Sequence, residues 1–366
     1  MIRERVFGLD LMRAVAILLV VFWHSADVLG QLYPRLWLPP YMEGVDLFFV
    51  LSGYLIGGIL LRRGAEVGSS SWTWLVDFWQ RRWLRTLPNY YLFLLVNVLL
   101  AITGITGGLI NHNIWFYLVF LQNVWHPMDL FYWESWSLVV EEWYYILFPL
   151  CWLMATRLFR PRASSSFLFV CALFIVLPAV LRASLAADTP SLFDFEQGAR
   201  KMLFTRLDTI GFGMLAAWLH HRYPARWTAV RWPLFVIGLL GMGFNSTLYD
   251  NDRMLYASSW FYSVNALVMA SMLPFLASWK AVPRGGGWIV RISIISYSLY
   301  LVHQPVRACW NRLLWDHVIS LDLIGYVLYW LACIALAWLV HRYWEKRFMD
   351  LRDRIGARLK TRVSSS

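Results

Sequence analysis

The chain has 366 residues, of which 59% are hydrophobic and only 15% are charged, and its mean hydropathy is +0.52. Soluble domains carry more charge, and the many separate apolar runs predict a helical protein that crosses a membrane several times. The net charge of +11 would favour a nucleic-acid partner in a soluble protein. In a membrane protein, basic loops on the inner side explain such a charge, so we expect no nucleic-acid partner.

Apolar runs of helical length recur along the whole chain. With the N-terminus placed in the cytoplasm, most of the 33 Lys and Arg residues fall in inner loops and in the C-terminal tail. We therefore expect an all-α polytopic membrane protein of about ten transmembrane helices, with both termini cytoplasmic. A shorter run at 113–125 is expected to be interfacial or re-entrant. The ten expected spans are 9–29, 45–62, 88–106, 136–157, 167–186, 206–221, 232–248, 257–277, 287–305 and 321–343.

The first run carries a polar stripe. Arg13 and His24 lie within it, and a charge inside a membrane helix costs free energy, so it indicates a functional site. Eleven residues at about 100° each amount to roughly three turns, which places both side chains on one face, about 16 Å apart. Asp10, three residues before Arg13, can pair with it. We expect this face to line a cavity or a partner helix.

The second run combines small residues with a hydroxyl. Gly53 and Gly57 are four residues apart and favour close helix packing, and Ser52 lies beside them. Asp46 stands at the outer start of this run. The four cysteines lie in or beside apolar runs without paired spacing, so we predict neither a disulfide framework nor a metal site.

Arg81, Arg82 and Arg85 form a basic group in the inner loop before Pro88. On a helix they share faces, and guanidinium groups beside aromatic residues suit phosphate binding. The alternative is ordinary inner-loop charge in contact with lipid headgroups.

Polar residues from several later spans are expected to gather in the outer half of the membrane. Simpler explanations stay open: Ser137 can satisfy Glu141, Arg206 and Asp208 can form a local ion pair, and His303 can be a hydrogen-bonded helix contact. Trp125 and Trp133 can stack on a sugar or anchor the protein at the interface. The gathering residues are Asp46, Ser137, Glu141, Glu142, Arg206, Asp208 and His303.

These motifs in this order resemble acyltransferase family 3, a family of integral membrane acyltransferases. Arg347 stands where the family's closing motif usually has proline. The resemblance spans about residues 6–350. The matching residues are Arg13 and His24; Phe48, Phe49, Ser52, Gly53 and Tyr54; Arg81, Arg82, Arg85 and Pro88; Trp136, Ser137, Leu138, Glu141 and Glu142; Arg206, Asp208 and Gly211; Ile295, Ser296, Tyr297, Tyr300, Leu301, His303 and Pro305; and the run from Trp344 to Phe348.

The resemblance implies a membrane acyltransferase domain at 1–350, followed by a basic cytoplasmic tail at 351–366, in the bacterial cytoplasmic (inner) membrane. It implies transfer of an acyl group, usually acetyl, from cytoplasmic acetyl-CoA to a hydroxyl of an envelope or secreted glycan, with no bound cofactor. Some members carry a further hydrolase-like domain that we do not find after residue 350. We therefore expect the protein to act alone or to hand its product to a separate partner.

Roles for the residues follow as hypotheses. His24 is expected to be the base that deprotonates the sugar hydroxyl, or the acceptor of a transient acyl group. Glu141 or Glu142 is expected to hold its tautomer. Ser52 is a candidate donor to the oxyanion. The donor is assigned Arg13, Arg81, Arg82 and Arg85, and Arg206, Asp208, His303 or Glu142 are further candidates for substrate binding.

Two other classes of protein fit part of the pattern. A proton-coupled exporter of a glycan or lipid would also use intramembrane charge, although no inverted repeat is apparent. A glycosyltransferase that uses a lipid-linked sugar would likewise place acids and arginines near the outer face. Dependence on acetyl-CoA separates the first class from both.

Overall fold

The computed structural model describes residues 5–27, 43–67, 72–106, 113–129, 131–158, 163–187, 189, 191–249, 255–315 and 323–364. Within these residues every regular element is a helix and no β-strand occurs, which confirms the predicted all-α fold. The elements are α1 (Phe7–Trp23), α3 (Gly44–Val67), α4 (Trp72–Ile102), α5 (Ile114–Leu118), α6 (Ser135–Leu158), α7 (Ala163–Ala187), α8 (Leu192–Gln197), η1 (Ala199–Lys201), η2 (Leu203–Thr205), α9 (Leu207–Arg222), α10 (Pro224–Ala229), α11 (Arg231–Ser246), η4 (Tyr256–Trp260), α12 (Phe261–Ser271), α13 (Leu273–Ser278), α14 (Gly287–Trp315), α15 (Leu323–Val340), η5 (His341–Glu345) and α16 (Lys346–Ser364).

Each of the ten predicted apolar runs overlaps helices of the structure. Within the described residues, six helices are long and apolar enough to cross a membrane, so the chain is a multi-pass membrane protein. The helices α1, α9 and α11 are shorter, with 17, 16 and 16 residues, and the number of ten spans remains a prediction. The six spans are Gly44–Arg62, Trp74–Ile102, Ser135–Arg157, Ser164–Ala186, Tyr256–Ser278 and Leu323–Ile355.

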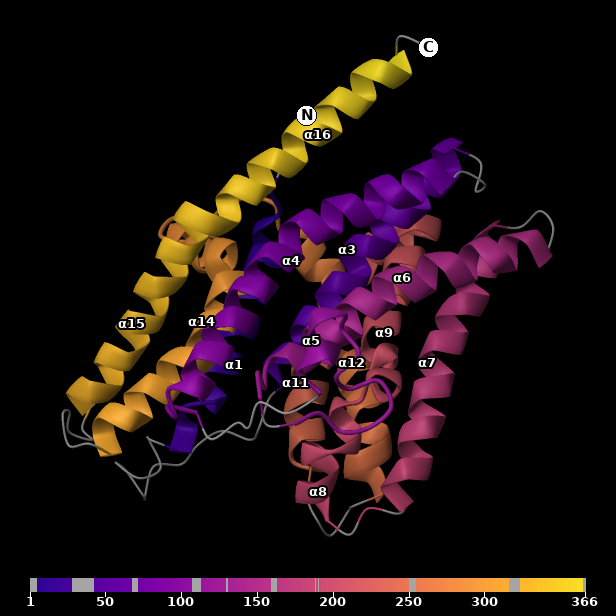
Figure 1. Cartoon of the computed structure of the whole chain (residues 1–366). Coiled ribbons are helices and arrows are strands. Elements are labelled where there is room, and N and C mark those ends of the chain that lie inside the picture. The colour runs from indigo at the N-terminus through magenta and orange to yellow at the C-terminus, as the bar shows by residue number, and fades with distance from the viewer. Residues whose placement is uncertain are drawn as a thin grey trace.

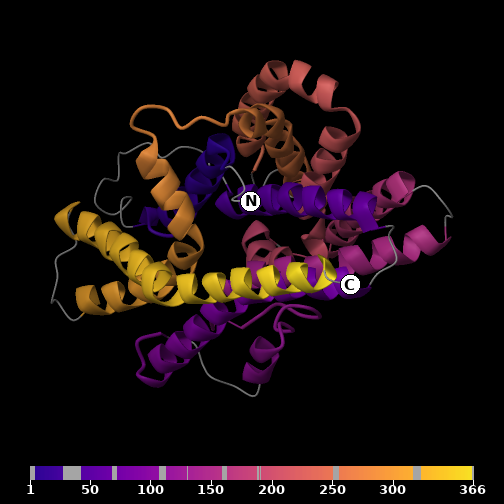
Figure 2. The same cartoon turned by 90° about the horizontal axis from the view of Figure 1, so that it is seen from above.

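The long helices run between two ends of the bundle, which we call the α16 end and the α8 end after the helices that mark them in Figure 1. Seen from above, α16 lies across its end of the bundle (Figure 2). The start of α1 is at the same end, because Arg5 and Arg352 line one cavity. Both ends of the described chain therefore lie on one side, and which side faces the cytoplasm remains a prediction. The boundary predicted at residue 350 falls inside α16.

The small residues of the second run pack against α9, not against the helix that carries His24. A Cβ on Gly53 would stand 2.1 Å from the backbone oxygen of Ile210, and one on Gly213 would stand 2.1 Å from that of Val50. Only glycine permits this approach, so the α3–α9 contact is fixed by its small residues, as predicted for close helix packing.

Two segments differ in detail from the sequence expectation. The arginine group does not lie in a loop, because α4 is continuous from Trp72 to Ile102 and includes Pro88. The run 113–125 forms only the five-residue helix α5, which is too short to cross a membrane. Its buried residues anchor it within the bundle: the Tyr90 hydroxyl donates to the backbone oxygen of Tyr117, and Trp143 Nε1 donates to that of Phe120.

Candidate functional site

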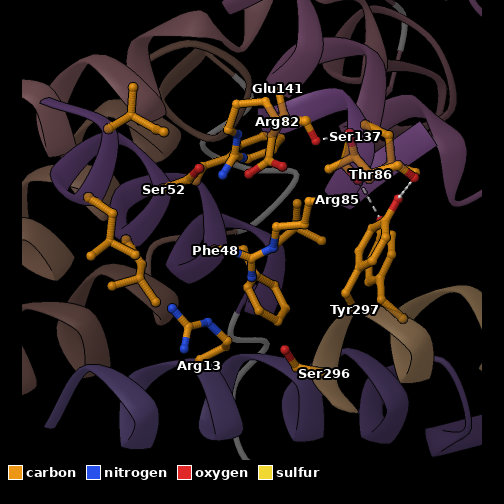
Figure 3. Close-up of a pocket in the computed structure, with 17 residues that line it drawn as sticks. Arg13, Phe48, Ser52, Arg82, Arg85, Thr86, Ser137, Glu141, Ser296 and Tyr297 are labelled. Carbon is orange, nitrogen blue, oxygen red and sulfur yellow. Dashed lines mark hydrogen bonds between the residues drawn. The ribbon is translucent and has the colours of Figure 1, made fainter. Parts of the chain in front are cut away.

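The polar stripe of α1 meets residues of four other helices around a cavity of about 110 Å³, which we call the central cavity. In Figure 3 the guanidinium groups of Arg13, Arg82 and Arg85 point into it, with Glu141 and Ser52 close by. The helices α3, α4, α6 and α14 supply the other walls. The central cavity therefore brings together side chains that the sequence separates by more than 280 positions, from Arg13 to Tyr300.

A larger cavity of about 960 Å³ occupies the α16 end, and we call it the basic cavity. It shares the lining residues Arg13, Leu55 and Arg85 with the central cavity, so the two meet at these side chains. The cationic side chains in its lining outnumber the carboxylates, which are Asp10 and Glu345. The basic residues are Arg5, Arg13, Arg62, Arg85, Lys280 and Arg352, with His220, His221 and His341 beside them.

A third cavity, of about 370 Å³, lies where the last turns of α4 and α14 meet the segment before α6, and we call it the distal cavity. Trp133, Glu134, Gln304 and Arg307 are among its lining residues. It is separated from the central cavity by Tyr300 and its neighbours on α14.

Arg13 is held in place at the junction of the basic and central cavities. Its Nη1 lies 3.0 Å from Asp10 Oδ1 and 3.0 Å from Ser293 Oγ on α14, and Ser293 Oγ donates to the same carboxylate oxygen at 2.8 Å. The Asp10–Arg13 pair is as predicted. Because Asp10 also binds Arg5 at 2.8 Å, one carboxylate orients two guanidinium groups.

The opposite wall of the central cavity carries Arg82 and Glu141. The guanidinium of Arg82 lies over the Tyr145 ring, 4.1 Å from its centroid, and Arg82 is the strongest electrostatic partner of Glu141. The Ser52 hydroxyl contacts the Tyr145 hydroxyl. Arg82 and Arg85 form no ion pair within the described residues. This wall therefore presents two half-buried guanidinium groups and the Glu141 carboxyl to the cavity.

His24 and His303 form a pair at α14, next to residues that line the central and distal cavities. His24 Nδ1 lies 2.7 Å from His303 Nε2, and the rings stack with centroids 4.9 Å apart. His303 Nδ1 lies 2.6 Å from the backbone oxygen of Tyr300, which lines the central cavity, whereas the next residue, Gln304, lines the distal one. Neither histidine is a lining residue of the three cavities, and the pair lies beside the part of α14 that leads from the central cavity at Tyr300 to the distal cavity at Gln304.

The contacts of this pair fix the tautomers if both rings are neutral. A carbonyl oxygen only accepts, so His303 Nδ1 must carry the hydrogen. His303 Nε2 then accepts from the Nδ1–H of His24, and His24 Nε2 keeps its lone pair. Glu141 or Glu142 was expected to hold the His24 tautomer, whereas the structure places His303 against His24 Nδ1. Helix rotation explains the difference: Glu142 faces α4, where it accepts from the Thr86 hydroxyl at 2.7 Å.

Two other predicted site residues, Arg81 and Ser137, are engaged by neighbouring side chains. Arg81 pairs with Asp77 at 2.8 Å, one helical turn earlier, and lines none of the three cavities. Ser137 lines the central cavity but contacts the Tyr300 hydroxyl at 2.7 Å, not Glu141. The orientation of α4 accounts for Arg81, because Arg82 and Arg85 turn toward the bundle.

Arg206 and Asp208 do not pair with each other. Arg206 binds Asp46, which also accepts from Asn265 Nδ2, and Asp208 binds Arg182 at 2.7 Å. All four charged side chains are fully buried. We call these residues the paired cluster. A lone Arg182 inside an apolar run was the available sequence signal, and it was missed.

Three further residues at the cavities were not selected from the sequence. Ser293 binds Arg13, Glu134 lines the distal cavity, and Glu345 accepts from Ser298 Oγ at 2.6 Å and lines the basic cavity. Glu345 lies in a motif noted for its family resemblance, but its burial depends on helix packing. Within the described residues, no group of three or more His, Cys, Asp or Glu is arranged to hold a metal ion.

A multi-pass helical bundle with buried arginines and a histidine pair along a row of cavities defines a membrane protein with an internal polar site. The model of the acyltransferase domain of acyltransferase family 3 matches residues 6–342, and the chain belongs to that family. No solved structure matches it.

The relatives are bacterial proteins. The O-acetyltransferase OatA of Staphylococcus aureus strain NCTC 8325 is 26% identical over an alignment of 325 residues that covers 82% of this chain and 50% of that protein. A protein of strain COL, whose name carries O-acetyltransferase as a provisional description, is 27% identical over 324 residues, with the same two coverages. The chain therefore spans about half the length of the curated relatives it matches.

Proposed function

We propose that this protein is an O-acyltransferase of the bacterial inner membrane. It moves an acyl group, in the first place acetyl, from cytoplasmic acyl-CoA to a hydroxyl of an extracytoplasmic or lipid-linked glycan. The α16 end faces the cytoplasm. Family membership and the O-acetyltransferase relatives support the reaction class. The observation that carries the proposal is the pair of connected cavities that leads from the α16 end to Tyr300, whose backbone oxygen contacts His303 of the His24–His303 pair.

The basic cavity is the place for the donor nucleotide. Phosphate groups bind best to guanidinium groups, which can form two parallel hydrogen bonds. Arg13 and Arg85 stand where the basic cavity meets the central cavity, so the pantetheine arm would pass between them. Arg82 and Ser52 then face the arm's thioester end within the central cavity. Arg81, paired with Asp77, has no part in this arrangement.

The histidine pair supplies the proton transfer. His24 Nε2 takes the proton of the sugar hydroxyl as its oxygen forms a bond to the acyl carbon. The carbon–sulfur bond breaks, and the thiolate of CoA receives that proton from the imidazolium. His303 Nε2 holds the Nδ1–H of His24 throughout and stabilises the cation that forms. His303 is thus a positioning residue, and the carbonyl of Tyr300 sets its tautomer.

The acceptor approaches from the α8 end. Trp133 lines the distal cavity, and the Lys201 ammonium lies 3.3 Å from its ring centroid. Trp125 is 64% exposed and lines none of the three cavities, so it serves as an interface anchor. Asp208 and Arg206 support the fold in the paired cluster and do not bind the sugar. A separate partner protein that receives the product is compatible with this geometry.

The first experiment uses inverted membrane vesicles, whose cytoplasmic face is outside. Acetyl-labelled acetyl-CoA is added outside, and label in the vesicle glycans and free CoA are measured. We expect both with the wild type and neither with His24→Ala. His126→Ala is the matched control, because His126 is exposed and, among the described residues, hydrogen-bonds to its neighbour Pro127 alone.

The outcomes separate the function classes. Label transfer by the wild type and by His126→Ala alone supports the acyltransferase. Retained transfer in His24→Ala removes His24 from the mechanism. No label and no CoA release, with intact protein and glycan present, contradicts the proposal and favours the exporter.

A further inference from the structure

The distal cavity contains a buried carboxyl group that the mechanism above does not use. Glu134 is 2% exposed, and its Oε1 is buried without a hydrogen-bond partner within the described residues. The side chain lines the distal cavity. Leaving a buried polar group unpaired costs free energy, and such groups in a fold call for a ligand or a solvent contact.

Glu134 is fixed relative to the histidine pair. Its backbone oxygen accepts from the Tyr300 hydroxyl at 3.0 Å and from Ser137 Oγ at 3.3 Å. The backbone oxygen of the same Tyr300 binds His303. One tyrosine therefore joins the carboxyl-bearing residue to the pair, so a molecule held by Glu134 would lie in a defined place beside His24.

The charged neighbours of His24 point to the same cavity. They are Arg307, Lys201 and Arg200. Arg307 lines the distal cavity and pairs with Asp27 at 2.7 Å, and Lys201 lies against the Trp133 ring. The distal cavity is thus the described cavity on the α8 side whose lining includes a charged neighbour of His24, Arg307.

The lining suits a sugar ring. A volume of about 370 Å³ lies within the usual range of small-molecule sites. Tyr132 and Trp133 give an aromatic wall, and Glu134, Gln304 and Asn311 give hydrogen-bonding groups of both kinds. This combination matches a ring that carries several hydroxyl groups better than it matches an acyl chain.

Resting on the function proposed above, we propose that the distal cavity is the acceptor subsite and that Glu134 is its specificity-determining residue, which hydrogen-bonds sugar hydroxyl groups next to the reacting one. Glu134 acts on binding and orientation of the acceptor. The proton of the reacting hydroxyl goes to His24.

The protonation state of Glu134 sharpens the inference. Burial raises the pKa of the Glu134 carboxyl to about 8, so at pH 7 the group is mostly protonated and can both donate and accept. Above pH 8 it ionises and loses its donor. The titratable and charged groups that line the distal cavity or contact its lining residues are Tyr132, Tyr300, Arg307, Arg312 and Lys201.

The test titrates an oligosaccharide fraction prepared from the envelope of the source bacterium against detergent-solubilised protein. Acetyl-CoA is saturating, and the half-saturating concentrations of glycan and of acetyl-CoA are both measured. We expect Glu134→Ala to raise the value for glycan about 10-fold or more, because sugar hydroxyls lose a buried partner. The value for acetyl-CoA should stay within about twofold, since the basic cavity is untouched. Asp129→Asn is the matched control, because Asp129 lies in the same segment but lines none of the three cavities.

Glu134→Gln gives a second readout that a structural role would not produce. At pH 7 the amide replaces the protonated acid, so we expect partial rescue, to within about threefold of the wild type. As the pH rises through about 8, the wild type should lose affinity for glycan while Glu134→Gln does not. Burial lowers the pKa of Lys201 to about 7, but this group titrates in both proteins and cancels in their ratio.

The results are easily told apart. An unchanged glycan titration in Glu134→Ala overturns the acceptor subsite, and so does an equal rise for glycan and acetyl-CoA. A wild type that labels no glycan and releases no CoA would instead remove the proposed function itself.

Discussion

The paired cluster and the central cavity are built from the same residue types, yet they differ in whether the arginines form ion pairs with carboxylates. In the paired cluster, Arg182 binds both oxygens of Asp208, at 2.7 and 3.1 Å, and Ser263 Oγ donates to the same carboxylate at 2.6 Å. Around the central cavity, Arg82 and Arg85 face open space without an ion pair among the described residues.

The difference shows what a buried charge means in this protein. A buried ion pair costs about as much in desolvation as it gains in attraction, so the paired cluster holds the helices in register without needing a ligand. Arg82 and Arg85 are half-buried and form no ion pair among the described residues, so their guanidinium groups stay available to an anionic group that enters the cavity. Burial of a charge therefore does not mark the site by itself; the site is where guanidinium groups line a cavity, two of them, Arg82 and Arg85, without an ion pair among the described residues.

The largest expected effect is a loss of acyl-transfer rate, and it comes from a change in the His24–His303 pair beside the central cavity. His303→Ala should lower the rate of acyl transfer about 100-fold or more, because His24 loses the group that fixes its tautomer. Adding His303→Ala to His24→Ala should cost little further, since the two residues act as one unit. Initial rates of label transfer for the two single variants and the double variant measure this. If the two losses multiply, the histidines act independently.

A substitution in the paired cluster should lower the stability of the protein without changing its catalysis. Asp208→Asn leaves the Arg182 guanidinium uncompensated in the core, so we expect a loss of about 3–5 kcal/mol of stability. The half-saturating concentration of acetyl-CoA should stay the same for the protein that remains folded. Thermal unfolding of the purified protein in detergent gives the first quantity, and initial rates give the second.

A double variant that removes both charges of the Arg182–Asp208 pair tests whether this pair has a structural role alone. Arg182→Met combined with Asp208→Leu removes both charges and should recover most of the lost stability, because an apolar pair of similar size can replace a buried ion pair. A double variant that folds well but no longer transfers the acyl group would show that the paired cluster belongs to the active site. That result would contradict a purely structural role for these ion pairs.

The sequence predicted the parts of the fold that depend on local pattern. Apolar runs located the helices, and the spacing of Asp10 and Arg13 on one helix predicted their pair correctly. Contacts between distant helices depend on rotation and register, which no single run encodes. The partners of His24, Asp46 and Asp208 were therefore not predicted, although all three residues had been noted. Close packing of a helix against Gly53 and Gly57 was predicted, but the sequence did not show that this helix is α9.

The smallest and most selective effect concerns two arginines of α4. Arg85 stands at the junction of the basic and central cavities, whereas Arg81, one turn earlier, pairs with the partly exposed Asp77. Arg85→Ala should raise the half-saturating concentration of acetyl-CoA about 10-fold or more, because charge-assisted hydrogen bonds to the donor are lost. Arg81→Ala should change it less than about twofold, since exposed pairs contribute little. Both changes put alanine into the same helix and remove the same charge, so a shared effect on folding or on membrane charge cancels between them. Equal effects of the two variants would indicate that the whole arginine group contacts lipid headgroups. An effect of Arg85→Ala alone would indicate that the donor phosphates bind where the basic and central cavities meet.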